Sequence, residues 1–235
     1  MMSTCTQPPA SLEQLPDELL LQILKFSMHH EGQFYPEYCV HLFNESRRFR
    51  RLSRPGNQQR PHLQDWCMVN ATSRSIRRVG KEVFFSCKTI AMSFDFPQRL
   101  RNGEFPAFGT PAEQQLALRL MRSINIVNMM ATYPSTILQL PETLQVFPKL
   151  KHAMLSFGYS VYDQNMSFLS WILGVDDVWL VLRLLHEAGV PEKVVLQMGI
   201  HESLPRSEFL EFLELDVCPR LRDEVDRMKK AQSRK

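Results

Sequence analysis

Strand-like apolar runs that alternate with helix-like segments are the feature that most constrains how this chain can fold. Each run is short and rich in apolar residues, and the runs cover residues 89–94, 123–130, 150–157 and 193–200. Strands that alternate with helices favour a parallel sheet built by helical crossovers. The sequence therefore predicts an α/β fold in which these four segments form the sheet.

The segments between these runs carry helix signals. Thr110 followed by Pro111 and Glu113 is typical of a helix N-terminus, because the hydroxyl caps the first turn and proline fits its first position. Gly189 is a suitable C-terminal stop for a helix that starts at Asp176. The predicted helices after residue 88 cover residues 114–122, 141–147, 176–187, 207–216 and 220–228.

The spacing of the predicted strands is irregular but close to the period of leucine-rich repeats. We therefore predict that residues 89–228 form a small, irregular repeat-like domain of alternating strands and helices. Repeat-like domains need caps at their ends, and the two predicted helices nearest the C-terminus are candidates for closing the far end. Residues 229–235 are rich in lysine and arginine and are predicted to form a basic tail.

A strongly apolar helix is predicted near the N-terminus. Residues 1–11 lack apolar periodicity and are expected to form a flexible leader. Residues 15–26 are predicted to be helical, since Pro16 suits the first turn and Asp17 and Glu18 complement the helix dipole. The apolar side chains of this helix cover a wider arc than one core contact needs. Either the fold encloses the helix on two sides or one side is open to a partner.

Residues 29–62 interrupt the helical pattern. They contain glycine, several prolines and an arginine run, and they are predicted to be mostly exposed loop. Helical spacing returns at residues 66–83, where apolar positions such as Trp66 and Val79 fall on one side. Gly80 is a candidate break in this second helical segment. The basic positions on its opposite side are Arg74, Arg77, Arg78 and Lys81.

The positive charge of the chain is concentrated in one region. The formal net charge is +3 at pH 7, but nine arginines and Lys81 fall between residues 47 and 81 against the single acidic residue Asp65. A basic cluster of this kind attracts nucleic acid, an acidic lipid surface or an acidic protein through the same Coulomb interaction. The arginine run is also a candidate nuclear address. The candidate basic surface comprises Arg47, Arg48, Arg50, Arg51, Arg74, Arg77, Arg78 and Lys81.

The sequence contains no recognisable catalytic motif. It lacks a glycine-rich phosphate loop, a Gly-x-Ser-x-Gly elbow, a His-Glu-x-x-His zinc motif and a kinase signature. The five cysteines are scattered without a Cys-x-x-Cys pair, so we expect reduced thiols, no metal and no cofactor. A thiol nucleophile at Cys67 or Cys87 with His152 as its base stays an alternative that nothing in the sequence orients. No apolar run is long enough to span a membrane and no secretory signal is evident, so a non-secreted, non-enzymatic protein without membrane association is expected.

The N-terminal segments resemble an F-box. Residues 29–62 separate the two halves of the match, whereas an ordinary F-box is nearly continuous, and such an interruption resembles divergent F-box-like proteins of filamentous fungi. Residues 147–155 also resemble the strand entry found in repeats of F-box substrate receptors. The residues that carry the F-box resemblance are Leu15-Pro16-Asp17-Glu18-Leu19-Leu20 and Ile23-Leu24 in the first half, and Leu63, Trp66, Val69-Asn70 and Ser73-Arg74 in the second.

In that family the motif folds as a small helical bundle that docks on a Skp-type adaptor and tethers a substrate receptor to a cullin-RING (SCF-type) ubiquitin ligase. The resemblance implies an F-box-like helical module over residues 12–88 with a basic insertion at 29–62. It also implies that catalysis belongs to other subunits, that an unknown protein substrate is the second partner, and that the protein works in the cytoplasm, the nucleus or both. The residues that match the docking and packing positions of the motif are Leu15, Pro16, Leu19, Leu20, Ile23, Leu24 and Val69.

Three functions from different classes follow from these observations. A substrate-recruiting F-box-like adaptor requires an exposed apolar side on the first helix. A freestanding interaction protein with a degenerate F-box and no ligase link requires that side to be covered. A binder of nucleic acid or acidic surfaces through residues 47–81 requires binding that weakens steeply with salt. This last function is the least favoured, because only Phe49 interleaves the arginine run and base stacking needs exposed aromatic side chains.

Overall fold

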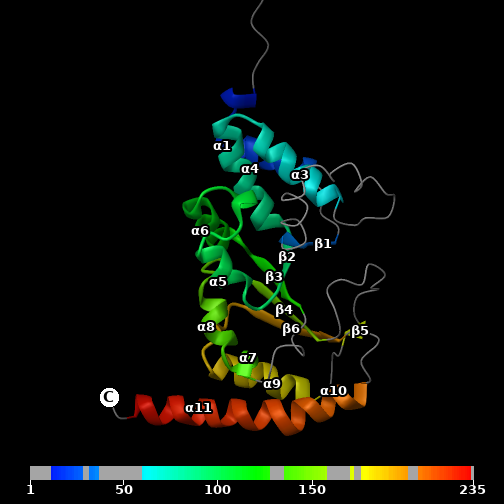
Figure 1. Cartoon of the computed structure of the whole chain (residues 1–235), viewed down its shortest axis with the longest axis vertical. Helices are drawn as coiled ribbons and strands as arrows, with labels where there is room; N and C mark the ends of the chain where they lie inside the picture. The colour runs from blue at the N-terminus through cyan, green and yellow to red at the C-terminus, as the bar shows by residue number, and fades with distance from the viewer. Residues whose placement is uncertain are drawn as a thin grey trace, which may run out of the picture.

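The computed structural model describes residues 12–28, 32–36, 60–127, 135–157, 170–171, 176–200 and 206–233. The described part of the chain is an elongated column with a sheet along its middle (Figure 1). The helices at one end of the column are α1 (Asp17–Ser27), α3 (Arg60–Ala71) and α4 (Arg74–Cys87). Those at the opposite end are α9 (Asp176–Glu187), α10 (Arg206–Phe212) and α11 (Cys218–Gln232).

The described residues form one sheet in which consecutive strands of the chain are mostly neighbours. The strand order is β1-β2-β3-β4-β6-β5, and the strands are parallel from β1 to β6, with β5 antiparallel at the edge. This arrangement confirms the predicted α/β class with a parallel sheet and the four predicted strand segments, as far as these are described. The strands are β1 (Gln33–Phe34), β2 (Thr89–Met92), β3 (Ser123–Ile126), β4 (His152–Phe157), β5 (Ser170–Trp171) and β6 (Val195–Ile200).

The two faces of this sheet differ in chemistry because side chains alternate along each strand. One face is apolar, and its aligned rows run from Phe34 through Ile124 to Leu196. The other face carries many polar and small side chains, in rows that run from Gln33 through Ser123 to Val195. Helices α5 (Phe96–Arg101), α6 (Pro111–Leu120) and α8 (Leu140–Gln145) lie along one side of the sheet (Figure 1). They cover the apolar face, whose side chains are buried in the core.

The helix signals between the strands are confirmed. Thr110 Oγ1 accepts a hydrogen bond from the backbone N–H of Glu113, and the Glu113 carboxylate accepts one from the backbone N–H of Thr110, so α6 begins with a complete capping box. Helix α9 has the predicted bounds, and Gly189 follows it with a positive φ of 114° that favours glycine. Helices α5 and α7 (Ser135–Leu138) were not predicted, because each is too short to show a helical period.

The predicted break at Gly80 is wrong. Helices α3 and α4 are separated at Thr72 and Ser73, and Gly80 lies inside α4. The two helices approach closely at Gly80, because a Cβ built there would lie 3.0 Å from a methyl carbon of Val69. Glycine is therefore needed at this position for close packing of the two helices.

The expectation that residues 29–62 are exposed loop is wrong for two described segments within that range. Phe34 is a buried residue of strand β1, which extends the sheet beyond β2, and Arg60 already belongs to α3. The ring of Phe34 packs edge-on against Phe84 of α4, with 5.1 Å between the ring centroids. One continuous hydrophobic core therefore extends from the N-terminal helices through the sheet to α11.

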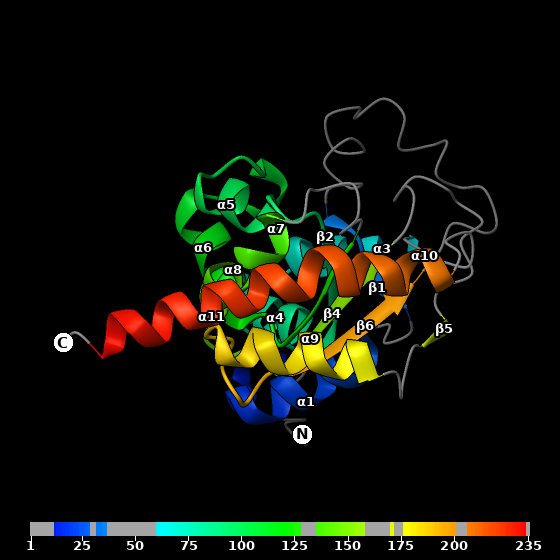
Figure 2. The same ribbon diagram turned by 90° about the horizontal axis from the view of Figure 1, so that it is seen from below.

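The C-terminal helices close the far end of the sheet. The predicted break between two helices near residues 216–220 is instead a π-helical turn (Leu213–Val217), which joins α10 to α11. Pro219, which has no backbone N–H to donate, comes directly after this turn. Seen from below, α11 crosses this end of the molecule beside α9 (Figure 2).

Candidate protein-docking site

Helix α1 is anchored along one side to α4. Leu20, which is 2 % exposed, and Met28 are buried in the core, and Leu24 packs against it. The guanidinium of Arg78 in α4 donates a hydrogen bond to the Asp17 carboxylate in the first turn of α1, and this bond raises the pKa of Arg78. These contacts fix which side of α1 faces away from the protein.

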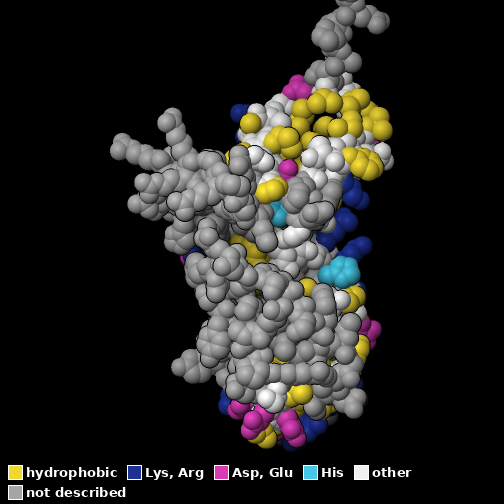
Figure 3. Space-filling view, turned by 90° about the vertical axis from the view of Figure 1, so that its right-hand side faces the viewer, with side chains coloured by type: hydrophobic (Ala, Val, Ile, Leu, Met, Phe, Trp, Pro, Cys, Tyr) yellow, Lys and Arg dark blue, Asp and Glu magenta, His cyan; other side chains and the backbone are white. Residues whose placement is uncertain are grey.

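A ridge of exposed apolar side chains runs along another side of α1. Phe26 is 87 % exposed, Leu19 is 48 % exposed and Ile23 is 43 % exposed. Because they are spaced i, i+4 and i+7, these three side chains lie on one face of the helix, and we call them the apolar ridge. Hydrophobic side chains gather at this end of the molecule in Figure 3. An amphipathic helix with an uncovered row of this spacing has the geometry of a surface that packs against a partner protein.

Other apolar residues near α1 differ in position from the apolar ridge. Leu12 is also exposed, and it belongs to the short 3-10 turn (Leu12–Gln14) that precedes α1. Leu21 is 37 % exposed, but it lies two residues after Leu19 and therefore roughly 200° around the helix. Leu21 does not belong to the apolar ridge, so it can serve as a control position on the same helix.

The residues predicted to bind a partner fall into two groups. Leu19 and Ile23 belong to the apolar ridge, and Pro16 is exposed just before the helix, with Leu15 half-buried beside it. The second group consists of packing residues: Leu20 and Val69 are in the core, and Leu24 packs against it. These three side chains hold α1 and α3 in place and do not face solvent as a contact surface. Phe26, the most exposed of the ridge, was missed because it lies outside the matched motif, although its spacing from Leu19 identifies it.

The predicted basic surface is only partly present on α4. The Lys81 side chain is buried, and its Nζ donates a hydrogen bond of 2.5 Å to Glu113 Oε1, which lowers the pKa of Glu113. Arg78 pairs with Asp17, and half-buried Arg77 donates to the Thr72 carbonyl at 3.0 Å. Arg74 is exposed. The prediction of a basic, solvent-facing side is therefore wrong for Lys81, and it lies outside the described residues for Arg47, Arg48, Arg50 and Arg51.

The polar face of the sheet carries a hydrogen-bonded row of side chains. Asn125 is buried in the middle of this row, where its Nδ2 donates to Gln33 Oε1 and its Oδ1 accepts from Ser156 Oγ, each at 2.8 Å. Thr89 and Ser123 hydroxyls are hydrogen-bonded at 3.0 Å on the neighbouring row. A buried polar network of this kind fixes the register of three strands. The partly or fully exposed residues of this face are Gln33, Thr89, Ser123, His152, Met154, Val195 and Gln197.

The cysteine–histidine alternative gains no support from the described residues. Cys67 lies on α3 and is exposed, and partial burial raises the pKa of its thiol, which disfavours the reactive thiolate. His152 lies at the start of β4, and no contact joins it to Cys67 or Cys87 within the described ranges. Within those ranges no group of histidine, cysteine and carboxylate side chains is arranged to hold a metal ion. None of the helices that are described combines the length and apolar character needed to cross a bilayer.

No family model matches this chain, and neither the curated proteins nor the solved structures include a match. The apolar ridge and the other surfaces of the described residues therefore supply the basis for a function.

Proposed function

We propose that this protein is a non-catalytic, F-box-like substrate-recruiting adaptor of a cullin-RING ubiquitin ligase. In this proposal the N-terminal helices dock on a Skp-type adaptor, and the rest of the chain holds a protein substrate. The contribution to the reaction is proximity, since a tethered substrate lies near the charged ubiquitin carrier at high effective concentration. Such a protein would act in the cytoplasm, the nucleus or both.

The observation that supports this proposal most strongly is the apolar ridge on α1. A helix inside a closed fold would bury Leu19, Ile23 and Phe26, whereas here all three face outward. A docking helix must also be held in place by the rest of the protein. The buried Leu20 and the Asp17–Arg78 ion pair attach α1 to the fold. A pre-organised helix loses little conformational freedom when a partner covers its exposed row, and this favours docking.

The polar face of the sheet is the surface we propose for the second partner. The parallel strands follow one another in chain order and helices cover the apolar face, and both features support the proposal of a short repeat-like domain. His152, Val195 and Gln197 on the polar face remain accessible and are spread over two adjacent strands. An extended row of mixed polar and apolar side chains is suited to binding a segment of another protein.

The alternative of nucleic-acid binding is less well supported. It was predicted to act through residues 47–81; on α4, Arg78 pairs with Asp17 and Lys81 with Glu113, while Arg47, Arg48, Arg50 and Arg51 lie outside the described residues. Removing the buried Lys81 side chain from its ion pair with Glu113 would cost free energy before any phosphate were bound. A freestanding interaction protein with a degenerate F-box and no ligase link requires the apolar side of α1 to be covered, whereas Leu19, Ile23 and Phe26 are exposed.

The experiment that tests this proposal is a pull-down of the full chain with a purified Skp-type adaptor. The test variant is the double substitution Leu19→Asp and Ile23→Asp, which places two charges on the exposed ridge without touching the core. The control is Leu21→Asp, because it places one aspartate on the same helix away from the ridge. Circular dichroism establishes that each variant is folded.

We expect the wild type and Leu21→Asp to retain the adaptor and the double variant to lose it. The loss should be on the order of 100-fold in affinity, because two carboxylates would have to be buried at the interface. Equal binding by all three proteins would show that the apolar ridge is not the docking surface. Failure of the folded wild type to bind would refute the ligase link.

A further inference from the structure

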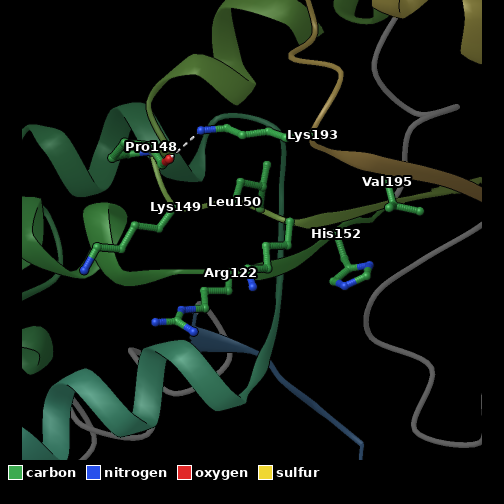
Figure 4. Close-up of a pocket in the computed structure, with 8 residues that line it drawn as sticks. Arg122, Pro148, Lys149, Leu150, His152, Lys193 and Val195 are labelled. Atoms are coloured by element: carbon green, nitrogen blue, oxygen red, sulfur yellow. Dashed lines mark hydrogen bonds between the residues drawn. The ribbon is translucent and has the colours of Figure 1, made fainter.

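A basic pocket lies at the N-terminal ends of strands β3, β4 and β6. Its volume is about 500 Å³, and it is lined by Arg122, Pro148, Lys149, Leu150, Lys151, His152, Lys193 and Val195 (Figure 4). Four of these eight residues are lysine or arginine and none is acidic. The pocket is separate from the apolar ridge of α1, but it shares His152 and Val195 with the sheet face proposed above for the protein substrate.

The register of the sheet brings these cations together. Ser123, His152 and Val195 are aligned across β3, β4 and β6. Arg122 and Lys151 immediately precede the first two of these residues, and Lys193 lies two residues before the third. Neighbouring parallel strands are about 4.8 Å apart, so the residues that enter them are necessarily close.

Backbone hydrogen bonds extend this alignment beyond the strands. The N–H groups of Lys151 and His152 donate to the Arg122 carbonyl at 2.8 and 3.1 Å, and the N–H of Val195 donates to the Lys151 carbonyl at 2.8 Å. The backbone positions of Arg122 and Lys151 are therefore fixed, and only their side chains are free to adjust to a ligand.

The positive charge of the pocket is not neutralised within the described part of the chain. Arg122, Lys149, Lys151 and Lys193 form no ion pair there, in contrast to Lys81 and Lys88, which pair with Glu113 and Asp65. Lys193 donates to the Pro148 carbonyl at 3.0 Å, which holds its ammonium at the rim (Figure 4). Like charges around one pocket without a counter-charge repel one another, and a bound anion reduces this repulsion.

We propose that this pocket binds a small anion that carries two or more phosphate groups. Phosphate suits the donor set, because a guanidinium binds two phosphate oxygens at once and lysines add point charges around it. The volume lies in the range of ordinary ligand sites and exceeds the needs of a single phosphate ion. Leu150 is buried, and it lines the pocket together with Val195 and Pro148, so the polar side chains of the lining are His152 and the four lysine and arginine residues.

The test is isothermal titration calorimetry of the full chain with tripolyphosphate, pyrophosphate and orthophosphate. The variant is the double substitution Arg122→Gln and Lys151→Gln. The matched control is Arg220→Gln and Arg222→Gln, which removes two exposed positive charges from α11, outside the pocket. The melting temperature of each variant is measured to establish that it folds.

We expect saturable binding of one tripolyphosphate per chain, weaker binding of orthophosphate, and an affinity at least about tenfold lower in the pocket variant. The control should bind as the wild type does. Absence of saturable binding to the folded wild type would overturn the proposal, as would an equal loss of affinity in the control.

A second arm distinguishes a free ligand from a lipid headgroup, since both present clustered phosphates. The full chain is sedimented with vesicles that contain or lack a lipid with a bisphosphorylated headgroup. Sedimentation that soluble tripolyphosphate abolishes would assign the pocket to a headgroup. Tripolyphosphate binding without sedimentation would assign it to a soluble ligand.

Discussion

The ion pair between Asp65 and Lys88 should be among the most sensitive points of the fold. Lys88 Nζ lies 2.7 Å from Asp65 Oδ2, and both residues are buried, at 3 % and 7 % exposed. Asp65 belongs to α3, whereas Lys88 connects α4 to β2, so the pair joins the N-terminal helices to the sheet. Lys88 Nζ also lies 5.3 Å from the centroid of the Phe84 ring.

Replacing Asp65 with asparagine removes the negative charge and leaves the ammonium of Lys88 buried. Breaking a buried pair in this way costs about 3–5 kcal/mol. The lysine can escape by losing its proton, and from the ordinary pKa of 10.5 this costs about 5 kcal/mol at pH 7 and about 2 kcal/mol at pH 9. The free energy of unfolding of Asp65→Asn should therefore be about 3–5 kcal/mol below wild type at pH 7.

The deficit should become smaller as the pH rises. Burial lowers the pKa of Lys88, and the hydrogen bond to Asp65 partly offsets this effect. Between a lowered folded-state pKa and the ordinary value, the unfolded chain binds more protons than the folded protein, so stability increases with pH in that window. Without Asp65 the folded-state pKa of Lys88 is lower still, so the pH range over which stability increases extends to lower pH. The deficit of Asp65→Asn should fall to about 2 kcal/mol near pH 9.

The assay is urea unfolding followed by circular dichroism at pH 7 and pH 9. The control is the double variant Asp65→Leu and Lys88→Met, which replaces the pair with apolar side chains and should unfold within about 2 kcal/mol of wild type. A single variant less than about 1 kcal/mol from wild type at pH 7 would refute this reasoning. A deficit that does not change between the two pH values would refute the assignment to the charge of Lys88.

Four further predictions concern the helices. Thr110→Ala removes the cap of α6 and should lower the free energy of unfolding by about 1 kcal/mol in urea titrations, and an unchanged value would show that the capping box contributes nothing. Glu113→Gln should also be destabilising at pH 7, but its difference from wild type in the free energy of unfolding should become smaller in acid. The lowered pKa of Glu113 stabilises the fold above the ordinary glutamate pKa, and this stabilisation is lost as the pH falls through the lowered pKa. Unfolding measured between pH 3 and pH 7 checks this prediction, and a constant difference would contradict it. Gly80→Leu should cost at least about 2 kcal/mol because the new side chain collides with Val69, and a wild-type melting temperature would show that α3 and α4 are not held at this distance. Phe26→Ser should leave the melting temperature within about 2 °C of wild type, since this side chain is largely outside the fold, and a large decrease would show that Phe26 is covered.

The strands and several helices were predictable because their signals are local. Strands such as β4 and β6 are short, mostly apolar segments, and the cap at Thr110 is a pattern of four residues. Strand β1 was not predictable, because it is two residues long and depends on pairing with β2, far away in sequence. Local signals fix which segments become regular structure, but they do not report pairings over long separations.

The surfaces were less predictable than the fold for the same reason. The sequence indicated that α1 is apolar over a wide arc, but it did not indicate that Leu20 is covered while Phe26 is not, because α4 decides this. Lys81 was placed on the solvent side by helical spacing, yet Glu113, 32 residues later, pairs with it. The basic pocket depends on the register of β3, β4 and β6, which no local pattern specifies.

The most direct test of the central claim is equilibrium binding between the full chain and a purified Skp-type adaptor, measured by isothermal titration calorimetry. We expect a saturable complex of one chain with one adaptor, which the double variant Leu19→Asp and Ile23→Asp abolishes and Leu21→Asp leaves intact. No heat of binding from a folded wild-type chain, at adaptor concentrations that saturate an ordinary F-box protein, would contradict it.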